Sequence, residues 1–267
     1  MDEQSETNRR NWDERVGIHI GDRSGIYNVE AFLRGETGLL PLELAEIGDV
    51  AGLTVAHLQC HFGIDTLSLA RMGAQATGLD FSTSAIAAAR ELAQQAGIQA
   101  EFVEANVYDA AKHLTPGDFD LVYVSWGAIN WLQDIGAWAA TVSTILKPGG
   151  RLFVAEGHPA LLQLEEIDGQ LVVTYPLDTT LRFREEKTYA GDGQPMHNRD
   201  TFEWIHSTSS LITALLDNGM QLTSYREHDS LPWPAVSSMT QGDDRMFRMP
   251  EGKASPPLAF TLSASKL

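Results

Sequence analysis

The chain of 267 residues carries 19 lysines and arginines against 36 aspartates and glutamates, which gives a formal charge of −17. The basic residues form no stripe of the kind that displaces counterions from phosphates, so binding to nucleic acid or to an anionic membrane surface is disfavoured. Hydrophobic residues make up 43% of the chain and charged residues 21%, a balance typical of a globular protein with a buried core.

Cys60 is the one cysteine, which excludes an intramolecular disulfide and a cysteine-rich metal site. The first residues lack the basic start and apolar run of a secretory signal, and no stretch approaches the length of a membrane span. No His-Glu-x-x-His pattern indicates a catalytic metal. We therefore expect a cytoplasmic protein without a metal site, and the sequence leaves its oligomeric state open between a monomer and a homodimer.

The first 50 residues predict helices and turns, with an amphipathic helix over 39–47. From residue 54 to 156, short apolar runs alternate with helical patterns, as in the βαβ units of a parallel sheet. The expected strands are 54–58, 76–80, 100–104, 121–125 and 151–156. The expected helices are 64–72, 82–96 and 134–146, the second capped by Ser82 and stopped by Gly97, the third ended by Lys147-Pro148-Gly149-Gly150.

After residue 156 the pattern changes to alternation typical of antiparallel hairpins, over 170–175, 181–189 and 200–206. Turn signals lie at Asp168-Gly169 and over 191–193. A helix over 207–218, stopped by Gly219, and strands over 220–227 and 258–265 follow, with a long loop over 230–257 between these strands. The chain thus predicts an α/β fold with a mostly parallel seven-stranded sheet and an antiparallel insertion at 157–206.

Ligands of open parallel sheets bind at the carboxyl ends of the strands, so the residues after the first strand are the first place to look. They read Leu58-Gln59-Cys60-His61-Phe62-Gly63. Asp80 closes the second strand, and a carboxylate there can accept both hydrogen bonds of a ribose diol. The alternative is that Asp80 caps the helix that begins just after it.

The ordered set of motifs resembles class I S-adenosylmethionine-dependent methyltransferases over about residues 53–156. The set comprises the glycine-containing turn, Asp80, Ala105-Asn106-Val107-Tyr108, Asp118-Phe119-Asp120-Leu121-Val122 and Leu146-Lys147-Pro148-Gly149-Gly150. We expect the insertion at 157–206, together with the loop over 230–257, to cover the carboxyl edge of the sheet as a substrate lid. The resemblance implies a Rossmann-like, doubly wound domain over 51–267, covered by the helical segment 1–50. It also implies S-adenosylmethionine as cofactor, S-adenosylhomocysteine as product and a small-molecule methyl acceptor.

The first motif departs from the pattern of this family, which usually carries an acid and three closely spaced glycines. Those positions hold His57, Gln59, His61 and Gly63, so only the last glycine is kept. Glycines allow unusual backbone angles and a close approach to the ligand. Gln59 and His61 can instead offer side-chain hydrogen bonds to the methionine part of the cofactor.

The resemblance implies a contact for each matching position. His57, Gln59, Cys60, His61 and Gly63 would face the amino-acid part of the cofactor, Asp80 its ribose, Phe81 its adenine ring, and Asn106 and Val107 the adenine amino edge. Ser125 and Trp126 would lie beside the methionine moiety and the reacting methyl group, and Tyr27 would cap the sulfonium by a cation–π contact.

Candidates for the substrate pocket come from three segments. They are Trp12 and His19 near the N-terminus, Trp131 after the fourth strand and His158 after the fifth, with His158 as the general base for a hydroxyl substrate. The alternatives are aromatics that merely pack on the sheet and a structural histidine.

Two other functions stay open at this point. One is an enzyme of the same fold that uses the cofactor for a rearrangement or cyclisation without methyl transfer. The other is a nicotinamide-dependent oxidoreductase, which is disfavoured because its pyrophosphate requires a Gly-x-Gly-x-x-Gly turn that the chain lacks.

Overall fold

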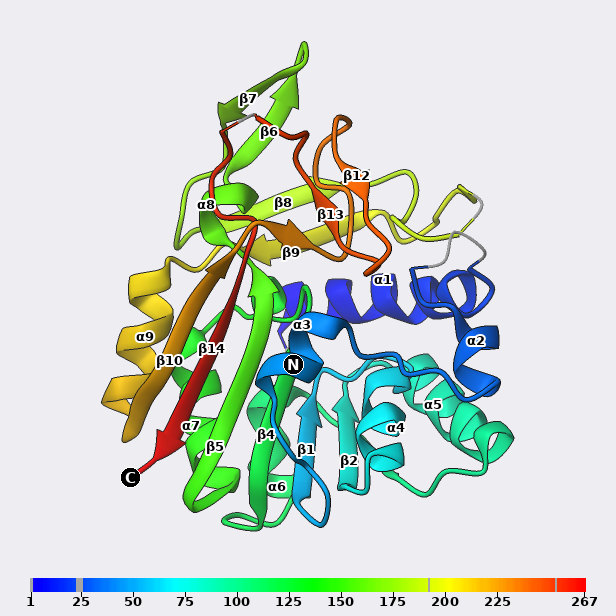
Figure 1. Cartoon of the computed structure of the whole chain (residues 1–267), viewed down its shortest axis with the longest axis vertical. Helices are drawn as coiled ribbons and strands as arrows, with labels where there is room; N and C mark the ends of the chain where they lie inside the picture. Colours follow the sequence, from blue (N-terminus) through cyan, green and yellow to red (C-terminus); the bar gives the residue numbers. More distant parts are fainter. Residues whose placement is uncertain (1, 23–25, 192, 253) are drawn as a thin grey trace.

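The computed structural model describes residues 2–22, 26–191, 193–252 and 254–267. Its centre is a sheet of seven strands: β1 (Thr54–Leu58), β2 (Gln75–Asp80), β3 (Glu101–Glu104), β4 (Phe119–Ser125), β5 (Leu146–Gly157), β10 (Met220–His228) and β14 (Ala259–Lys266). Their order is β10-β14-β5-β4-β1-β2-β3 (Figure 1). Strands β1 to β5 pair in parallel, and β14 pairs antiparallel with both β5 and β10. The predicted Rossmann-like, mostly parallel seven-stranded sheet is confirmed.

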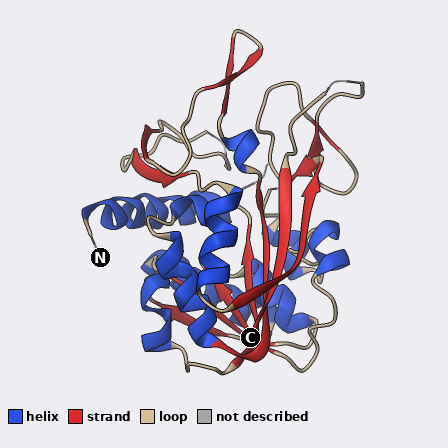
Figure 2. Cartoon of the chain, turned by 90° about the vertical axis from the view of Figure 1, so that its left-hand side faces the viewer, coloured by secondary structure: helices blue, strands red, loops and turns tan. Residues whose placement is uncertain are grey.

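Helices cover both faces of this sheet, as Figure 2 shows. The helices that follow the parallel strands are α4 (Ile64–Arg71), α5 (Thr83–Ala96), α6 (Ala110–His113) and α7 (Ile135–Ile145), and α9 (Thr208–Asp217) precedes β10. One core contains Trp138 of α7 and Leu211 of α9 together with Val122 and Val154 of the sheet. The other face packs Leu69 of α4 on Val55 and Leu121. The strands are therefore buried on both sides, which explains why they read as continuous apolar runs.

The N-terminal part is helical, with α1 (Glu3–Ile20), α2 (Val29–Leu33) and α3 (Pro41–Glu46). Helix α1 runs across the carboxyl edge of the sheet (Figure 1). Asn8 ties it to the antiparallel part: its Nδ2 donates to the Phe202 carbonyl at 2.7 Å and its Oδ1 accepts from the Phe202 N–H at 2.8 Å. The predicted helix over 39–47 is shorter than expected, because Leu40, the residue before Pro41, has an extended backbone.

The antiparallel segments lie above the same edge (Figure 1). After α8 (Pro159–Leu162) come the hairpin of β6 (Leu164–Ile167) and β7 (Gln170–Val173) and the pair β8 (Thr180–Arg184) and β9 (Asp200–Trp204). The segment predicted as a loop over 230–257 contains three short paired strands, β11 (Ser230–Leu231), β12 (Thr240–Gln241) and β13 (Phe247–Arg248). Asp192, within the turn predicted over 191–193, lies outside the described residues.

The helix predicted over 134–146 also needs a correction at its end. Leu146 already has an extended backbone, with φ −69° and ψ 142°, and it pairs with Phe119 of β4. The residues Lys147-Pro148-Gly149-Gly150, predicted as the stop of the helix, therefore belong to β5.

Candidate active site

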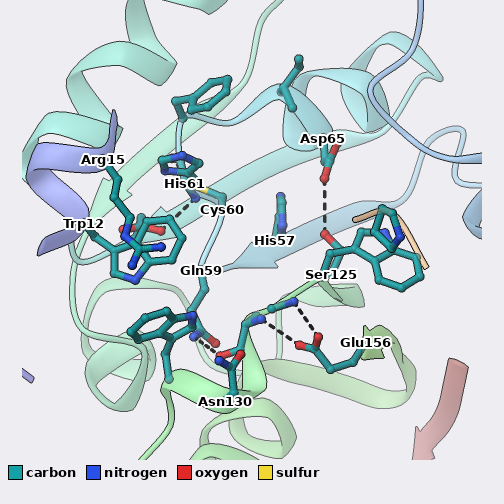
Figure 3. A pocket seen from close by; sticks show the side chains of 18 of the residues that line it. Trp12, Arg15, His57, Gln59, Cys60, His61, Asp65, Ser125, Asn130 and Glu156 are labelled. Carbon is teal, nitrogen blue, oxygen red and sulfur yellow. Dashed lines mark hydrogen bonds between the residues drawn. The ribbon is translucent and has the colours of Figure 1, made fainter. Parts of the chain in front are cut away.

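A cavity of about 430 Å³ opens at the carboxyl edge of the sheet, beneath α1 and the antiparallel segments (Figure 3). All the predicted site residues except His19 and His158 line it: Trp12, Tyr27, His57, Gln59, Cys60, His61, Gly63, Asp80, Phe81, Asn106, Val107, Ser125, Trp126 and Trp131. The elements that carry them are α1, the ends of β1 to β4, and the short helix η2 (Ile129–Trp131). The fold thus brings together residues that are up to 119 positions apart (131 − 12 = 119).

The turn after β1 has the backbone of a glycine-rich loop although two of its residues are not glycine. Gln59, His61 and Gly63 all lie in the left-handed region, with φ of 58°, 51° and 76°. Residues with a side chain pay about 1–2 kcal/mol each for this conformation. Such strain clusters at functional sites, where the surrounding structure holds it in place. The substitutions at positions 59 and 61 therefore change the side chains offered to a ligand and keep the path of the backbone.

Asp80 at the end of β2 clamps this turn. Its Oδ2 accepts the His61 N–H at 2.8 Å and its Oδ1 accepts the Ser82 N–H at 2.9 Å. Ser82 itself is the N-cap of α5, since its hydroxyl accepts the Ala85 N–H at 3.0 Å, so Asp80 is not the helix cap. Burial raises the pKa of Asp80 to about 6, although the two backbone N–H donors oppose this rise. Each carboxylate oxygen keeps a free lone pair that can accept a ligand hydroxyl.

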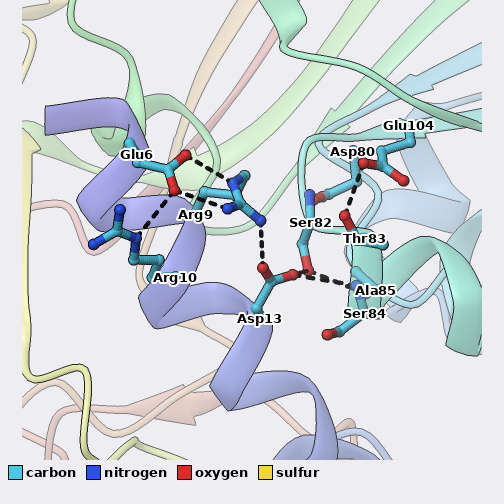
Figure 4. A network of polar contacts seen from close by, with 10 residues as sticks. All are labelled: Glu6, Arg9, Arg10, Asp13, Asp80, Ser82, Thr83, Ser84, Ala85 and Glu104. Carbon is cyan, nitrogen blue, oxygen red and sulfur yellow. Dashed lines mark hydrogen bonds and ion pairs between the residues drawn. The ribbon is translucent and has the colours of Figure 1, made fainter. Parts of the chain in front are cut away.

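Helix α1 is fastened to the same region by a network of charged side chains (Figure 4). Asp13 accepts hydrogen bonds from the Ser82 hydroxyl at 2.6 Å and from the Ser84 N–H at 3.2 Å. Arg9 holds the other oxygen of Asp13 at 2.6 Å and pairs with Glu6 at 2.8 Å. The helix is thereby fixed above the end of β2, with Trp12 toward the cavity.

An aromatic wall extends from α1 to the turn and to η2. The ring of Trp12 lies 5.1 Å from that of His61 and 5.3 Å from that of Trp131, both edge to face. The Arg15 guanidinium lies 5.1 Å from the Trp12 ring and 5.7 Å from the Trp131 ring. It is held by Asn11 at 2.6 Å and by Glu185. The Arg15 guanidinium is thus both hydrogen-bonded and stacked on the aromatic rings, which stabilises the wall.

His19, predicted for the substrate pocket, lies behind this wall and not in the cavity. Its Nδ1 is 3.0 Å from His61 Nε2 and its Nε2 is 2.7 Å from the Thr188 hydroxyl. Burial lowers the pKa of His19 to about 3, so the ring is neutral. Tyr27 stacks on it at 5.0 Å and reaches the cavity, where its hydroxyl is 2.5 Å from that of Tyr189. His19 therefore orients His61 and Tyr27.

Glu156, at the end of β5, organises the loop after β4. Its carboxylate accepts the N–H groups of Gly127 at 2.6 Å, Ala128 at 2.8 Å, Ile129 at 3.0 Å and Gly157 at 2.8 Å. Burial raises its pKa, and these four donors oppose the rise. The anchored loop turns Trp126 into the cavity, where its ring lies 6.3 Å from that of Trp233.

His158, predicted as the general base, lies outside the cavity. Its Nδ1 accepts the Ala160 N–H at 3.0 Å as the N-cap of α8, and its Nε2 lies 3.3 Å from a carboxylate oxygen of Glu227 on β10. The backbone of His158 continues the pairing toward β14, since its N–H donates to the Leu258 carbonyl at 2.9 Å. The ring therefore faces the antiparallel edge and not the cavity, apart from the other predicted site residues.

Besides Glu156, three carboxyl groups of the cavity with a raised pKa were not among the predicted site residues; Glu43 is buried, and Asp65 and Glu203 are half-buried. Burial raises the pKa of Glu43 to about 7, of Asp65 to about 6 and of Glu203 to about 7. Glu43 accepts the Leu40 N–H at 2.8 Å and the Tyr123 hydroxyl, and Glu203 accepts Asn130 Nδ2 at 2.8 Å. The cavity also contains Arg245 and Trp233 from the 230–257 segment. Asp65 lies in the first turn of α4, two residues after Gly63, and this position is the sequence signal that could have identified it.

None of the helices in the described ranges is long and apolar enough to cross a membrane. No group of three or more His, Cys, Asp or Glu side chains in the same ranges is arranged to hold a metal ion.

The parallel sheet with its antiparallel edge, and the cavity over the turn after β1, have the arrangement that the resemblance to class I S-adenosylmethionine-dependent methyltransferases implies. Residues 56–152 match the family model described as "Methyltransferase domain". The chain therefore contains a methyltransferase domain.

Similar proteins agree with this assignment. A ubiquinone biosynthesis O-methyltransferase of Xanthomonas euvesicatoria is 32% identical over 107 residues, which cover 40% of this chain and 44% of that protein. One of Klebsiella pneumoniae is 34% identical over 118 residues, 42% of this chain and 48% of its own length. These matches span less than half of the relatives.

Solved structures support the fold over a longer stretch. A putative S-adenosylmethionine-dependent methyltransferase of Listeria monocytogenes has a TM-score of 0.60 at 19% identity and covers 85% of this chain and 96% of its own. One of Mesorhizobium loti has a TM-score of 0.58 at 20% identity, covering 88% of this chain and 100% of its own.

Proposed function

We propose that the protein transfers a methyl group from S-adenosylmethionine to a small-molecule acceptor. The observation that carries this proposal is the left-handed turn from Gln59 to Gly63, clamped by Asp80 at the floor of the cavity. The path of this turn lets a ligand approach the backbone closely. The Oε1 atom of Gln59 is buried there and has no hydrogen-bond partner among the described residues, which is the condition of a group that a ligand completes.

The other cavity residues suit the parts of the cofactor in turn. Asp80 would accept the ribose hydroxyls, and Phe81 and Val107 would contact the adenine. The Oδ1 of Asn106 accepts the Tyr108 N–H at 3.0 Å and keeps one lone pair, so the amide offers both an acceptor and the Nδ2 donor to the adenine edge. Tyr27 and Trp12 would enclose the sulfonium from the N-terminal side.

The cofactor supplies an already activated methyl group, so the protein contributes mainly alignment and exclusion of water. Side chains from the predicted covering segments line the cavity: Trp12 from the N-terminal segment, Leu162, Glu185, Tyr189 and Glu203 from 157–206, and Pro232, Trp233, Gln241 and Arg245 from 230–257. We infer that these segments form the lid and select the acceptor. A cavity of about 430 Å³ suits a small molecule. The charge of −17 disfavours nucleic acid as the acceptor.

Calorimetric titration with S-adenosylhomocysteine tests the cofactor part of this proposal. We expect saturable binding by the wild-type chain and a roughly tenfold or greater loss of affinity in Asp80→Asn, because the variant loses a charged acceptor. Asp118→Asn is the matched control, since Asp118 is exposed and outside the cavity. Binding of a nicotinamide dinucleotide with no response to S-adenosylhomocysteine would contradict the proposal.

The reaction is tested by incubation with S-adenosylmethionine and pooled small-molecule extracts. Formation of S-adenosylhomocysteine, together with a product heavier by one methyl group in place of a hydrogen, would support methyl transfer. An acceptor that is converted without gain of a methyl group, while the cofactor stays intact, would instead identify an enzyme that rearranges or cyclises its substrate.

A further inference from the structure

Asp65 is a carboxylate of the cavity that none of the contacts above explains. It lies in the first turn of α4 and lines the cavity beside Ser125, at the end of β4 (Figure 3). The Ser125 hydroxyl donates to its Oδ2 at 3.3 Å, which is long for a hydrogen bond between two oxygens. Asp65 forms no ion pair with any described residue. The carboxylate is therefore half-buried at the cavity wall and poorly satisfied by the protein.

None of the charged groups around Asp65 in the described ranges forms an ion pair with it. Arg245 acts on it electrostatically, but the guanidinium donates its Nη2 hydrogen bond to the Leu39 carbonyl at 2.8 Å. Glu43 is a second carboxyl nearby and is already bonded to Leu40 and Tyr123. Burial lowers the pKa of His57 to about 3, so this neighbour carries no charge.

A half-buried carboxylate without an ion-pair partner carries a cost of desolvation that a cationic group of a ligand would offset. The N-terminus of α4 offsets part of this cost, because the helix dipole favours an anion there. The location of the carboxylate also matters. His57 takes the position at which the family usually has an acid, and its Nδ1 lies 2.8 Å from the hydroxyl of Thr66, the residue next to Asp65. The negative charge missing from β1 is thus present nearby on α4.

We propose that Asp65 binds the α-ammonium group of S-adenosylmethionine and so compensates for the acid that is absent at position 57. This inference rests on the proposed function, because it requires the amino-acid part of that cofactor to lie at the ends of β1 and β4. Asp65 would provide a charged hydrogen-bond acceptor for the ammonium group at this place. The Ser125 hydroxyl would keep the carboxylate oriented.

Two ligands that differ only in the amino group test this role. S-adenosylhomocysteine and its deamino analogue, in which hydrogen replaces the amino group, are titrated calorimetrically into the wild-type chain and into Asp65→Asn. We expect Asp65→Asn to weaken binding of S-adenosylhomocysteine roughly tenfold to a hundredfold and to change binding of the analogue less than about twofold. Asp243→Asn is the charge-matched control, because Asp243 is exposed and outside the cavity, and it should leave both affinities unchanged.

The outcomes separate this inference from the proposed function. Equal affinity of wild type and Asp65→Asn for S-adenosylhomocysteine, or an equal loss for both ligands, would overturn the role of Asp65. Failure of the wild-type chain to bind S-adenosylhomocysteine would count against the proposed function itself. Thermal unfolding without ligand provides a second readout: the midpoint of Asp65→Asn should stay close to that of wild type, since Asp65 forms no ion pair and accepts one long hydrogen bond, which an asparagine oxygen can also accept. A lower midpoint would instead indicate a structural carboxylate.

Discussion

Gly63→Ala tests whether the turn after β1 is held by its surroundings. Gly63 has φ +76°, and an alanine in this left-handed conformation costs about 1–2 kcal/mol. A Cβ atom there would lie 2.5 Å from Phe102 Cε1, 2.8 Å from its Cζ and 3.0 Å from Ala89 Cβ. Both neighbours are buried, so the clash adds about 1–3 kcal/mol of overpacking. We expect the free energy of unfolding to fall by about 2–5 kcal/mol.

Urea unfolding followed by circular dichroism measures this loss, and Gly97→Ala is the matched control. Gly97 has φ +65° at the end of α5, and a Cβ atom there meets nothing within 4 Å. Its replacement should therefore cost only the backbone contribution of about 1–2 kcal/mol. If the two variants lose the same free energy of unfolding, the Phe102 ring moves aside without cost, and close packing does not hold the turn in place.

Three further predictions concern the buried polar groups. Glu156→Ala leaves four backbone N–H groups without their acceptor and should lower the free energy of unfolding by about 3–5 kcal/mol. Glu156→Gln should lose less, and equal stability of wild type and both variants would refute this role. The pKa of Glu203 rises from 4.5 to about 7 on folding, so between these pH values the folded chain holds a proton that the unfolded chain releases. Glu203 therefore destabilises the fold increasingly as pH rises through this range. Urea unfolding of Glu203→Gln should show a gain over wild type that grows by up to about 3 kcal/mol between roughly pH 4 and pH 8, and a constant difference would contradict the assignment. His158→Ala should cost about 1 kcal/mol of stability through the lost helix cap and leave affinity for S-adenosylhomocysteine unchanged; a large loss of affinity would return His158 to the site.

The central fold could be predicted because its signals are local. Strands buried on both faces are short apolar runs, and the ends of α5 follow from Ser82 as N-cap and Gly97 in the left-handed conformation. The end of α7 was misjudged because Leu146 pairs with Phe119, which lies 27 residues earlier in the chain (146 − 119 = 27). A proline and two glycines after it read as a turn, although the sheet continues through them.

The cavity could be predicted only in part, because several of its contacts join distant segments. The residues after β1, β2 and β3 were found because the carboxyl ends of parallel strands share one edge. His158 follows β5 in the same way, but the pairing of β14 with β5 leaves its ring against Glu227 on the far side. Asp65 contacts Ser125, which lies 60 residues away in the chain, and no local sequence pattern predicts that contact.

The left-handed backbone angles at Gln59 and His61 also could not be predicted from the sequence. Residues with a side chain seldom adopt them, so a glutamine and a histidine at these positions suggest a different turn. The hydrogen bond from the His61 N–H to Asp80 and the packing of Trp12 on the His61 ring hold the turn in place. The backbone geometry of a glycine-rich motif is therefore retained by tertiary contacts.

Calorimetric titration of the wild-type chain with S-adenosylhomocysteine tests the central claim most directly. The account predicts one saturable site per chain whose affinity falls roughly tenfold or more in Asp80→Asn and stays unchanged in Asp118→Asn. Absence of binding at millimolar ligand, or binding that Asp80→Asn leaves untouched, would contradict the placement of the cofactor over the turn after β1.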